Sequence, residues 1–296
     1  MSCKNCIKNP VIQLTNNNIK LCKNHFIHYF EKKVLRTIRK YDLLGDCKRI
    51  GVAVSGGKNS LIVLNILNNI INQRISKNIE LIAIHIDEGI KGFSENNNKI
   101  LKKFCNKNKI KLKVYSITKE FPKIKKMKIE SPYTVYGSLI RCLLNKESRK
   151  LKIERLATGH NLDSEAETII MNQLKNNIER SARLGVITGV KRDSRFIQRI
   201  KPLYFITGNE ASLYARLNDI KDIKNPYKDS FRTKVENMLS EMESKYPGTK
   251  NNIINSFLEV LPKLKEKYDT KIKNCKLCAE PCSSNICNTC KLLKLC

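Results

Sequence analysis

The 296-residue chain lacks any uninterrupted apolar run that approaches the ~20 residues of a membrane-spanning helix. It also lacks an apolar signal core at its N-terminus. These two absences argue against a membrane or secreted protein and predict a cytoplasmic location. Disulfides are rare in the cytosol, so we expect the 12 cysteines to be metal ligands or reduced thiols.

Acidic residues are scarce as well. The chain contains 27 Asp plus Glu against 57 Lys plus Arg, which gives a formal net charge of +30. A cation excess of this size favours a polyanionic partner, because each phosphate that is neutralised releases counterions. Compositional bias is the alternative source of the excess, since Asn and Ile are abundant too. We expect a nucleic acid as the partner, with a membrane surface as the weaker option.

Paired cysteines with two-residue spacing stand at both ends of the chain. Such a pair places two side chains on one tetrahedral ion, and two pairs complete a closed structural zinc site. Metal binding would then supply much of the folding free energy of these short segments. Cys282 is a spare candidate ligand, and Cys296 is expected to be a bystander. The predicted zinc ligands are Cys3, Cys6, Cys22 and His25 in the first site and Cys275, Cys278, Cys287 and Cys290 in the second.

The segment RIGVAVSGGKNS predicts a phosphate-binding loop. Residues 49–54 alternate β-branched and small side chains, which is typical of a short buried strand. Ser55–Ser60 follows directly and leads into a helical apolar pattern. Glycines at such a turn let the backbone approach an anion, and the helix start favours its negative charge. A plain small-residue turn is the alternative. The hexapeptide resembles the SGGxDS loop of the pyrophosphate-loop ATP pyrophosphatases, which adenylate a substrate oxygen.

Further strands are predicted downstream, over Ile79–Asp87, Lys111–Ile117 and Arg155–Thr158. A helix over Gly137–Leu151 precedes the last of them. Strands that alternate with helices predict an α/β fold with a doubly wound, mostly parallel sheet. From about Thr207 the pattern becomes helical, with prolines between the helical segments.

Polar residues follow the ends of these predicted strands. His85–Asp87 ends the second strand, and Gly159–Asn161 follows the fourth. Since ligands bind at the carboxyl ends of parallel strands, we expect both groups near the phosphate loop. Asp163 is expected to be the N-cap acceptor of the helix over residues 164–174. The tract over residues 96–111, rich in Asn and Lys, is expected to be a solvated helix and loop without chemistry.

An ordered set of motifs resembles the archaeal and eukaryotic cytosolic tRNA 2-thiouridine synthetases of the pyrophosphate-loop superfamily. The motifs are the N-terminal knuckles, SGGKNS, HIDEGI, ATGHNLDSEAET, KPL, the SFR…YPGT tract and the C-terminal ribbon. This resemblance implies adenylation of the C2 oxygen of a tRNA uridine by ATP, followed by replacement of that oxygen with sulfur. It also implies a ubiquitin-like sulfur carrier protein, a homodimer and, in bacterial and archaeal members, an iron–sulfur cluster near the ATP site.

Four segments are expected on this basis. They are an N-terminal zinc finger (residues 1–28), a Rossmann-like pyrophosphate-loop ATP-binding domain (29–206), a helical tRNA-contacting extension (207–270) and a C-terminal zinc ribbon (271–296).

The resemblance gives the polar residues their expected roles. Lys58 would neutralise the leaving pyrophosphate, and Mg²⁺ would screen the triphosphate. Asp163 would assist magnesium or orient the uridine, with a plain helix cap as the alternative. Arg141 would bind a tRNA phosphate, with a solvated helix face as the alternative, and His85 is either a ligand contact or a satisfied buried histidine. The expected nucleotide-binding residues are Ala53, Val54, Ser55, Gly56, Gly57, Lys58, Asn59, Ser60, His85, Ile86, Asp87, Gly159, His160 and Asn161.

The sequence departs from the family pattern at the expected cluster ligands. Tyr133, Tyr136 and Asn225 stand where the family has cysteines, and neither phenol nor amide provides the soft thiolate that iron–sulfur clusters need. A cluster is therefore not expected. Asn59 replaces an Asp of the phosphate loop. Cys142 is either a displaced sulfur-handling thiol or a small buried hydrophobe, and the buried interpretation is favoured.

Three functions are compatible with this sequence. The favoured one is a tRNA-modifying, adenylating sulfurtransferase that works without the cluster. The second is a degenerate, non-catalytic tRNA-binding homologue, and the third is a tRNA-adenylating ligase that uses a non-sulfur nucleophile.

Overall fold

The computed structural model describes residues 2–14, 18–72, 79–127, 129, 131–191, 193–223, 230–269 and 272–293. Asn225 and Cys296, which the sequence analysis singled out, lie outside these ranges.

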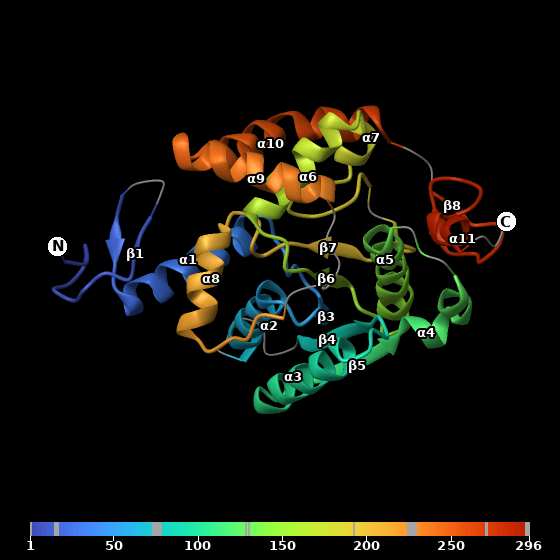
Figure 1. Ribbon diagram of the computed structural model, residues 1–296, viewed down its shortest axis with the longest axis horizontal. Helices are drawn as coiled ribbons and strands as arrows, with labels where there is room; N and C mark the ends of the chain where they lie inside the picture. The colour runs from blue at the N-terminus through green and yellow to red at the C-terminus, as the bar shows by residue number, and fades with distance from the viewer. Residues whose placement is uncertain are drawn as a thin grey trace.

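A five-stranded parallel sheet forms the centre of the molecule (Figure 1). Its strands occur in the order β5-β4-β3-β6-β7, with every neighbouring pair parallel. The predicted doubly wound α/β fold is therefore confirmed. The edge strand β7 was not predicted, since three residues are too few for an alternating pattern to be visible. The bounds are β3 (Arg49–Ala53), β4 (Glu80–Asp87), β5 (Lys111–Ser116), β6 (Arg155–Ala157) and β7 (Gln198–Ile200).

Helices cover both faces of this sheet, and the strand pleat sorts the apolar residues between them. Leu81 and Ala83 of β4 belong to one core with the buried residues of α1, α2, α3 and α8. Ile82 and Ile84, which point to the opposite face, pack in a second core with α5. The bounds are α1 (Lys23–Lys40), α2 (Lys58–Ile70), α3 (Phe93–Lys107), α5 (Pro132–Lys150) and α8 (Gly208–Leu217).

A helical group lies beyond the carboxyl end of β6. It comprises α6, α7, α9 and α10, which contact one another and lie along the top of Figure 1. Two short helices, α4 and a 3₁₀ helix, connect β5 to α5. The bounds are α6 (Leu162–Leu174), α7 (Ile178–Ser181), α9 (Ser230–Lys245), α10 (Thr249–Lys267), α4 (Ile117–Glu120) and the 3₁₀ helix (Pro122–Lys126).

The cysteine-rich ends of the chain lie at opposite ends of the long axis of the molecule (Figure 1). The first contains the hairpin of β1 (Ile12–Gln13) and β2 (Lys20–Leu21), and it runs directly into α1. The second contains β8 (Lys273–Asn274), β9 (Pro281–Cys282) and α11 (Asn288–Leu292), and α11 packs against α5. Among the described residues, no helix combines the length and the apolar character needed to span a bilayer.

Two predicted helix starts are wrong. Asp163 is not the N-cap of α6, because the helix begins at Leu162 and Asn161 caps it. The side chains of Asn161 and Ser164 form a reciprocal capping box, which satisfies two N–H groups that a later start would leave unpaired. Helix α5 begins at Pro132 rather than Gly137, since proline is well suited to the first helical turn, where its missing N–H is not needed.

Candidate nucleotide-binding cleft

The loop between β3 and α2 has the construction of an anion site. The Ser55 N–H donates to Ser60 Oγ (3.3 Å), and Ser60 Oγ donates to the Gly57 carbonyl (2.8 Å), so the turn is held closed by its own hydroxyl. Gly56 has a φ of +86°, and a Cβ there would lie 1.9 Å from Asn97 Oδ1. Only glycine fits this position. The loop therefore presents backbone N–H groups at the start of α2, where negative charge is favoured.

An acidic side chain occupies the start of α2. Asp222 accepts from the backbone N–H of Lys58 (2.9 Å) and from its Nζ (3.0 Å). The neighbouring Ile223 N–H donates to the Gly56 carbonyl (3.3 Å). The loop thus binds a carboxylate through the donors that the sequence analysis assigned to phosphate. Sequence reasoning missed Asp222, since it lies far from Lys58 in the chain and belongs to no recognised motif.

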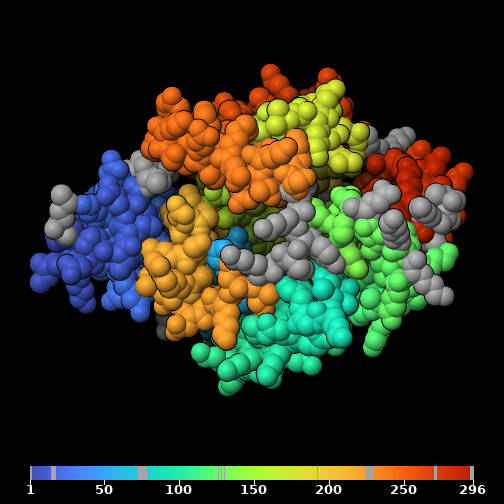
Figure 2. Space-filling view, in the orientation of Figure 1, coloured from blue at the N-terminus to red at the C-terminus, as the bar shows by residue number. Residues whose placement is uncertain are grey.

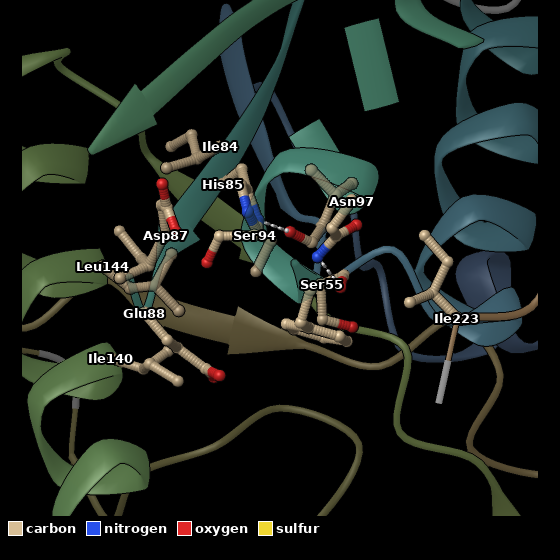
Figure 3. Close-up of a pocket in the computed structure, with 14 residues that line it drawn as sticks. Ser55, Ile84, His85, Asp87, Glu88, Ser94, Asn97, Ile140, Leu144 and Ile223 are labelled. Atoms are coloured by element: carbon tan, nitrogen blue, oxygen red, sulfur yellow. Dashed lines mark hydrogen bonds between the residues drawn. The ribbon is translucent and has the colours of Figure 1, made fainter. Parts of the chain in front are cut away.

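A pocket of about 120 Å³ opens beside the phosphate loop (Figure 3). Two strand ends form one side of it, and Ile140 and Leu144 of α5 approach from the other. Ser94 and Asn97 of α3 complete the lining. Gly56, Gly57, Lys58, Asn59 and Ser60 lie in the adjoining loop and do not line the pocket. The predicted nucleotide-binding residues that line it are Ala53, Val54, Ser55, His85, Ile86 and Asp87.

His85 connects the two strand ends. It is 4% exposed, and its Nδ1 donates to the Val54 carbonyl at 2.8 Å (Figure 3). Burial lowers the pKa of His85 below its ordinary value, so the ring is neutral at pH 7. The carbonyl acceptor fixes the proton on Nδ1. His85 is therefore a satisfied buried histidine that also forms part of the pocket wall.

Several oxygens around the cleft have no donor among the residues that the structure describes. Asn97 donates to the Ser55 carbonyl (2.8 Å), and Asn98 donates to Asp87 (3.1 Å). Burial and the neighbouring Asp87 raise the pKa of Glu88 to about 7. Buried acceptors without donors are rare in native proteins, and here they fit a ligand that carries N–H or O–H groups. The unpartnered atoms are Asn59 Oδ1, Glu88 Oε2, Asn97 Oδ1 and Asn98 Oδ1.

The two asparagines correct the expectation for residues 96–111. This tract does form a helix surface, but Asn97 and Asn98 also contribute to the cleft. Their role could not be predicted from the sequence, because asparagine is abundant throughout the chain and these two do not stand out.

The segment after β6 packs against the phosphate loop rather than lining the pocket. A Cβ on Gly159 would lie 2.7 Å from the Ser60 backbone nitrogen, so glycine permits this close approach. His160 and Asn161 follow, exposed and buried respectively. Asp163 accepts from the Gly208 N–H and from Nζ of Lys250, a largely buried lysine of α10. The carboxylate predicted to act on magnesium or uridine thus ties α6 to α8 and α10.

Each predicted zinc site brings its four ligand atoms together. In both sets the atoms lie within 4.8 Å of one another. Cys6 Sγ is 3.6 Å from Cys22 Sγ, and Cys275 Sγ is 3.8 Å from Cys290 Sγ. A tetrahedral zinc ion with ordinary Zn–S bonds places its sulfurs about 3.8 Å apart, so both sets can hold one metal ion. Cys282 is not part of the second set.

The remaining described cysteines lie away from the pocket. Cys47 is half-buried and Cys105 is buried, and burial raises the pKa of the Cys105 thiol to about 11. Cys142 contacts Thr289 of the C-terminal module, and burial raises its pKa too. No cysteine within the described ranges lines the pocket. Tyr133 is exposed on α5.

Comparisons with known proteins agree with this architecture. The PP-loop domain model matches residues 27–240. A tRNA-5-methyluridine(54) 2-sulfurtransferase of Pyrococcus horikoshii is 36% identical over 300 residues, which cover 98% of this chain and 93% of that protein. Cytoplasmic tRNA 2-thiolation protein 1 of Aspergillus niger is 28% identical over 295 residues, covering 96% of this chain and 85% of that protein.

A solved structure matches over the whole chain. It is the U34-tRNA thiolase NcsA of Methanococcus maripaludis with its 4Fe–4S cluster, at a TM-score of 0.84 and 28% identity, covering 100% of this chain and 96% of that chain. The chain therefore belongs to the PP-loop family, as the sequence analysis expected.

Proposed function

We propose that the protein is an ATP-dependent tRNA 2-thiolation enzyme, which converts a tRNA uridine to 2-thiouridine. The phosphate loop at the start of α2 carries this proposal, because it offers backbone donors and Lys58 to an anion. The pocket beside the loop is where the rest of the nucleotide would bind. The relatives named tRNA 2-sulfurtransferase and tRNA 2-thiolation protein supply the substrate class.

The first step is adenylation. The C2 oxygen of the uridine attacks the α-phosphorus of ATP, and the bond to pyrophosphate breaks. Lys58 and the loop amides hold the pyrophosphate, whose charge increases as it leaves. ATP displaces Asp222 from these donors when it binds. Mg²⁺ accompanies the triphosphate and screens its charge.

The second step is sulfur transfer. Hydrosulfide adds to C2 of the adenylated uridine, the C2–O bond breaks, and AMP leaves with the original oxygen. Loss of the sulfur-bound proton gives the thiocarbonyl, so no electrons are gained or lost. The described cleft contains no thiolate to hold an iron–sulfur cluster. The sulfur therefore comes directly from a second substrate, and a thiocarboxylated ubiquitin-like carrier protein remains the predicted donor.

The two cysteine clusters take zinc in this proposal. Four protein ligands close each site, so zinc there stabilises the fold and does no chemistry. The positions of the two sites at opposite ends of the molecule suit a role in holding an extended tRNA (Figure 1). A homodimer remains a prediction from the family resemblance.

The decisive experiment combines purified protein, unmodified tRNA, ATP–Mg²⁺ and sodium hydrosulfide. We expect pyrophosphate, AMP and 2-thiouridine, the last detected by mass spectrometry of the digested tRNA. Pyrophosphate without thiolated tRNA would indicate a ligase with a non-sulfur nucleophile. Absence of every product, with tRNA still bound, would indicate the non-catalytic homologue.

The absence of a cluster has its own test. Protein purified under anaerobic conditions should lack the broad visible absorption band of a 4Fe–4S centre and contain no stoichiometric iron. Thiolation should proceed equally well in air and under argon. An intact cluster at full occupancy would show that residues outside the described ranges supply its ligands.

A further inference from the structure

Two arginines on different elements lie side by side next to the cleft. Arg199 of β7 donates through Nη2 to the Arg141 carbonyl of α5 at 3.3 Å. The Arg141 guanidinium lies against the first half of α5, where its Nη1 is 3.5 Å from a Cβ built on Gly137. Partial burial lowers the pKa of Arg199 to about 10, and the charge of Arg141 adds to this shift. The charge of Arg141 is therefore felt at Arg199.

Two nearby cations have carboxylate partners, whereas no ion pair of Arg141 or Arg199 is found among the described residues. Lys201 forms a buried ion pair with Glu165 (2.7 Å), and Arg232 pairs with Glu167 (2.6 Å). Within the described ranges no ion pair joins the side chain of Arg141 or Arg199 to an acidic group. Two arginines that are joined through the Arg141 carbonyl, and that have no ion-pair partner among the described residues, indicate a site for an anionic ligand.

The histidine after β6 lies in the same cationic surroundings. Desolvation by the surrounding protein and the charges of Lys201, Arg199, Arg232 and Arg141 lower the pKa of His160 to about 3. Part of the residue is still exposed to solvent, and it does not line the pocket. His160 is therefore neutral at pH 7 and offers a hydrogen bond without adding to the charge.

The arginine pair lies near the pocket, where β7 meets α5. Ile140, the neighbour of Arg141 on α5, lines the pocket (Figure 3). β7 is separated from β3 by β6, so two strand spacings, about 10 Å, lie between Arg199 and the strand that leads into the loop. The ATP phosphates already have donors at the loop. The pair therefore suits a second anion that enters the same cleft.

We propose that Arg141 and Arg199 together bind a backbone phosphate of the RNA substrate, and thereby position the target nucleotide beside the pocket. This inference rests on the proposed function for the identity of the RNA. A guanidinium pair can hold a phosphodiester in a bidentate manner without reading its sequence. The site therefore contributes to RNA affinity and to the position of the RNA along the cleft, and other residues must recognise the base.

Binding measurements without turnover test this site. Fluorescence anisotropy with unmodified tRNA would be compared for the wild type, Arg141→Gln, Arg199→Gln and the double variant, across a series of KCl concentrations. We expect about a tenfold loss of affinity in the double variant and a slope of log Kd against log salt that is shallower by about 0.8, the value for one phosphate. Lys107→Gln, an exposed lysine on α3, is the matched control.

Measuring ATP binding to the same variants distinguishes the site for the RNA phosphate from the site for the ATP phosphates. We expect calorimetric ATP affinity to change less than twofold. A double variant that binds tRNA like Lys107→Gln, or that loses ATP affinity while tRNA binding is retained, would overturn the inference. These measurements detect binding and no product, so they test the inference separately from the proposed function. A protein that binds tRNA through this pair but never thiolates it would support the inference and disprove the proposed function.

A measurement on the wild-type protein tests the same site even if the variants fail to fold. Phenylglyoxal modifies accessible arginines, and mass spectrometry locates the sites. Bound tRNA should protect Arg141 and Arg199, whereas ATP–Mg²⁺ alone should protect neither. Equal modification with and without tRNA would contradict the proposal.

Discussion

The cysteine clusters at the two ends of the chain and the cleft between them are assembled in different ways. Each cluster takes its ligands from one short segment, and a two-residue spacing is enough to bring two of them to one ion. The cleft instead takes its residues from β3, β4, α3, α5 and the segment before α9. Figure 2 shows α9 and α10 along one edge of this face and α3 along the opposite edge.

This difference determines how each region should respond to damage. The C-terminal cluster has little apolar core of its own, so we expect its fold to depend on a bound metal, whereas Cys3 and Cys22 of the N-terminal cluster pack into the main core. The strands and helices that form the cleft are held in place by the two hydrophobic cores on either face of the sheet. Polar side chains of the cleft can therefore be changed with modest effects on stability. Single substitutions should therefore unfold the C-terminal cluster, whereas in the cleft they should lower activity and leave the fold intact.

The largest effect is expected at the C-terminal cluster. Cys275→Ser removes a buried cysteine that we propose ligates zinc, and we expect bound zinc to fall from two ions to one per chain, since zinc sites of this kind contribute about 10 kcal/mol to local folding. Elemental analysis and limited proteolysis would show the loss. Cys282→Ser, outside the ligand set, should keep both ions. Unchanged metal content in Cys275→Ser would contradict a zinc site there.

A large loss of activity without unfolding is expected at the phosphate loop. Lys58→Ala removes the cation that we propose faces the pyrophosphate, and we expect about a 100-fold lower rate of pyrophosphate release. The melting temperature should change little, because Lys58 forms only a partly exposed ion pair. Lys107→Ala serves as the control. A rate within twofold of the wild type would place the phosphates elsewhere.

The opposite sign is expected at the carboxylate that occupies this loop. Asp222→Asn removes a negative charge that we propose competes with ATP for the donors of Lys58. We expect ATP affinity to rise about threefold to tenfold in low salt, as for loss of a partly exposed charge contact. Isothermal calorimetry measures this directly. Weaker ATP binding would mean that Asp222 is part of the ATP site and not its competitor.

A pH dependence of stability is expected at Glu88. The pKa of Glu88 is about 7 in the folded protein against an ordinary value of 4.5. Between these values the native state keeps a proton that the unfolded chain releases, so stability falls as pH rises from 4.5 to 7. Glu88→Gln should therefore stabilise the protein at pH 8 by about 1–2 kcal/mol, allowing for partial exposure, and by almost nothing at pH 4. Urea unfolding at both pH values checks this, and an equal effect at both would contradict a raised pKa.

Local patterns in the sequence predicted the parts of the molecule that are local in space. The alternation in residues 49–54, the glycines after it and the cysteine spacings each encode their structure within a few residues. Helix starts were less predictable, because Asn161 and Asp163 are both good caps and only the bond to Ser164 decides between them. Contacts between residues that are distant in sequence left no signal in any local pattern.

Two contacts illustrate this limit. Asp222 reaches Lys58 only because the chain returns across the loop after α8. Lys250 reaches Asp163 only because α10 packs on α6. Both join residues that are distant in sequence, and a single sequence does not show such pairs.

The most direct test of the central claim follows one oxygen atom. A tRNA whose target uridine carries ¹⁸O at C2 would be incubated with the protein, ATP–Mg²⁺ and hydrosulfide, and the released AMP analysed by mass spectrometry. Activation at the phosphate loop predicts one ¹⁸O in each AMP for every 2-thiouridine formed. Thiolated tRNA accompanied by unlabelled AMP would contradict it.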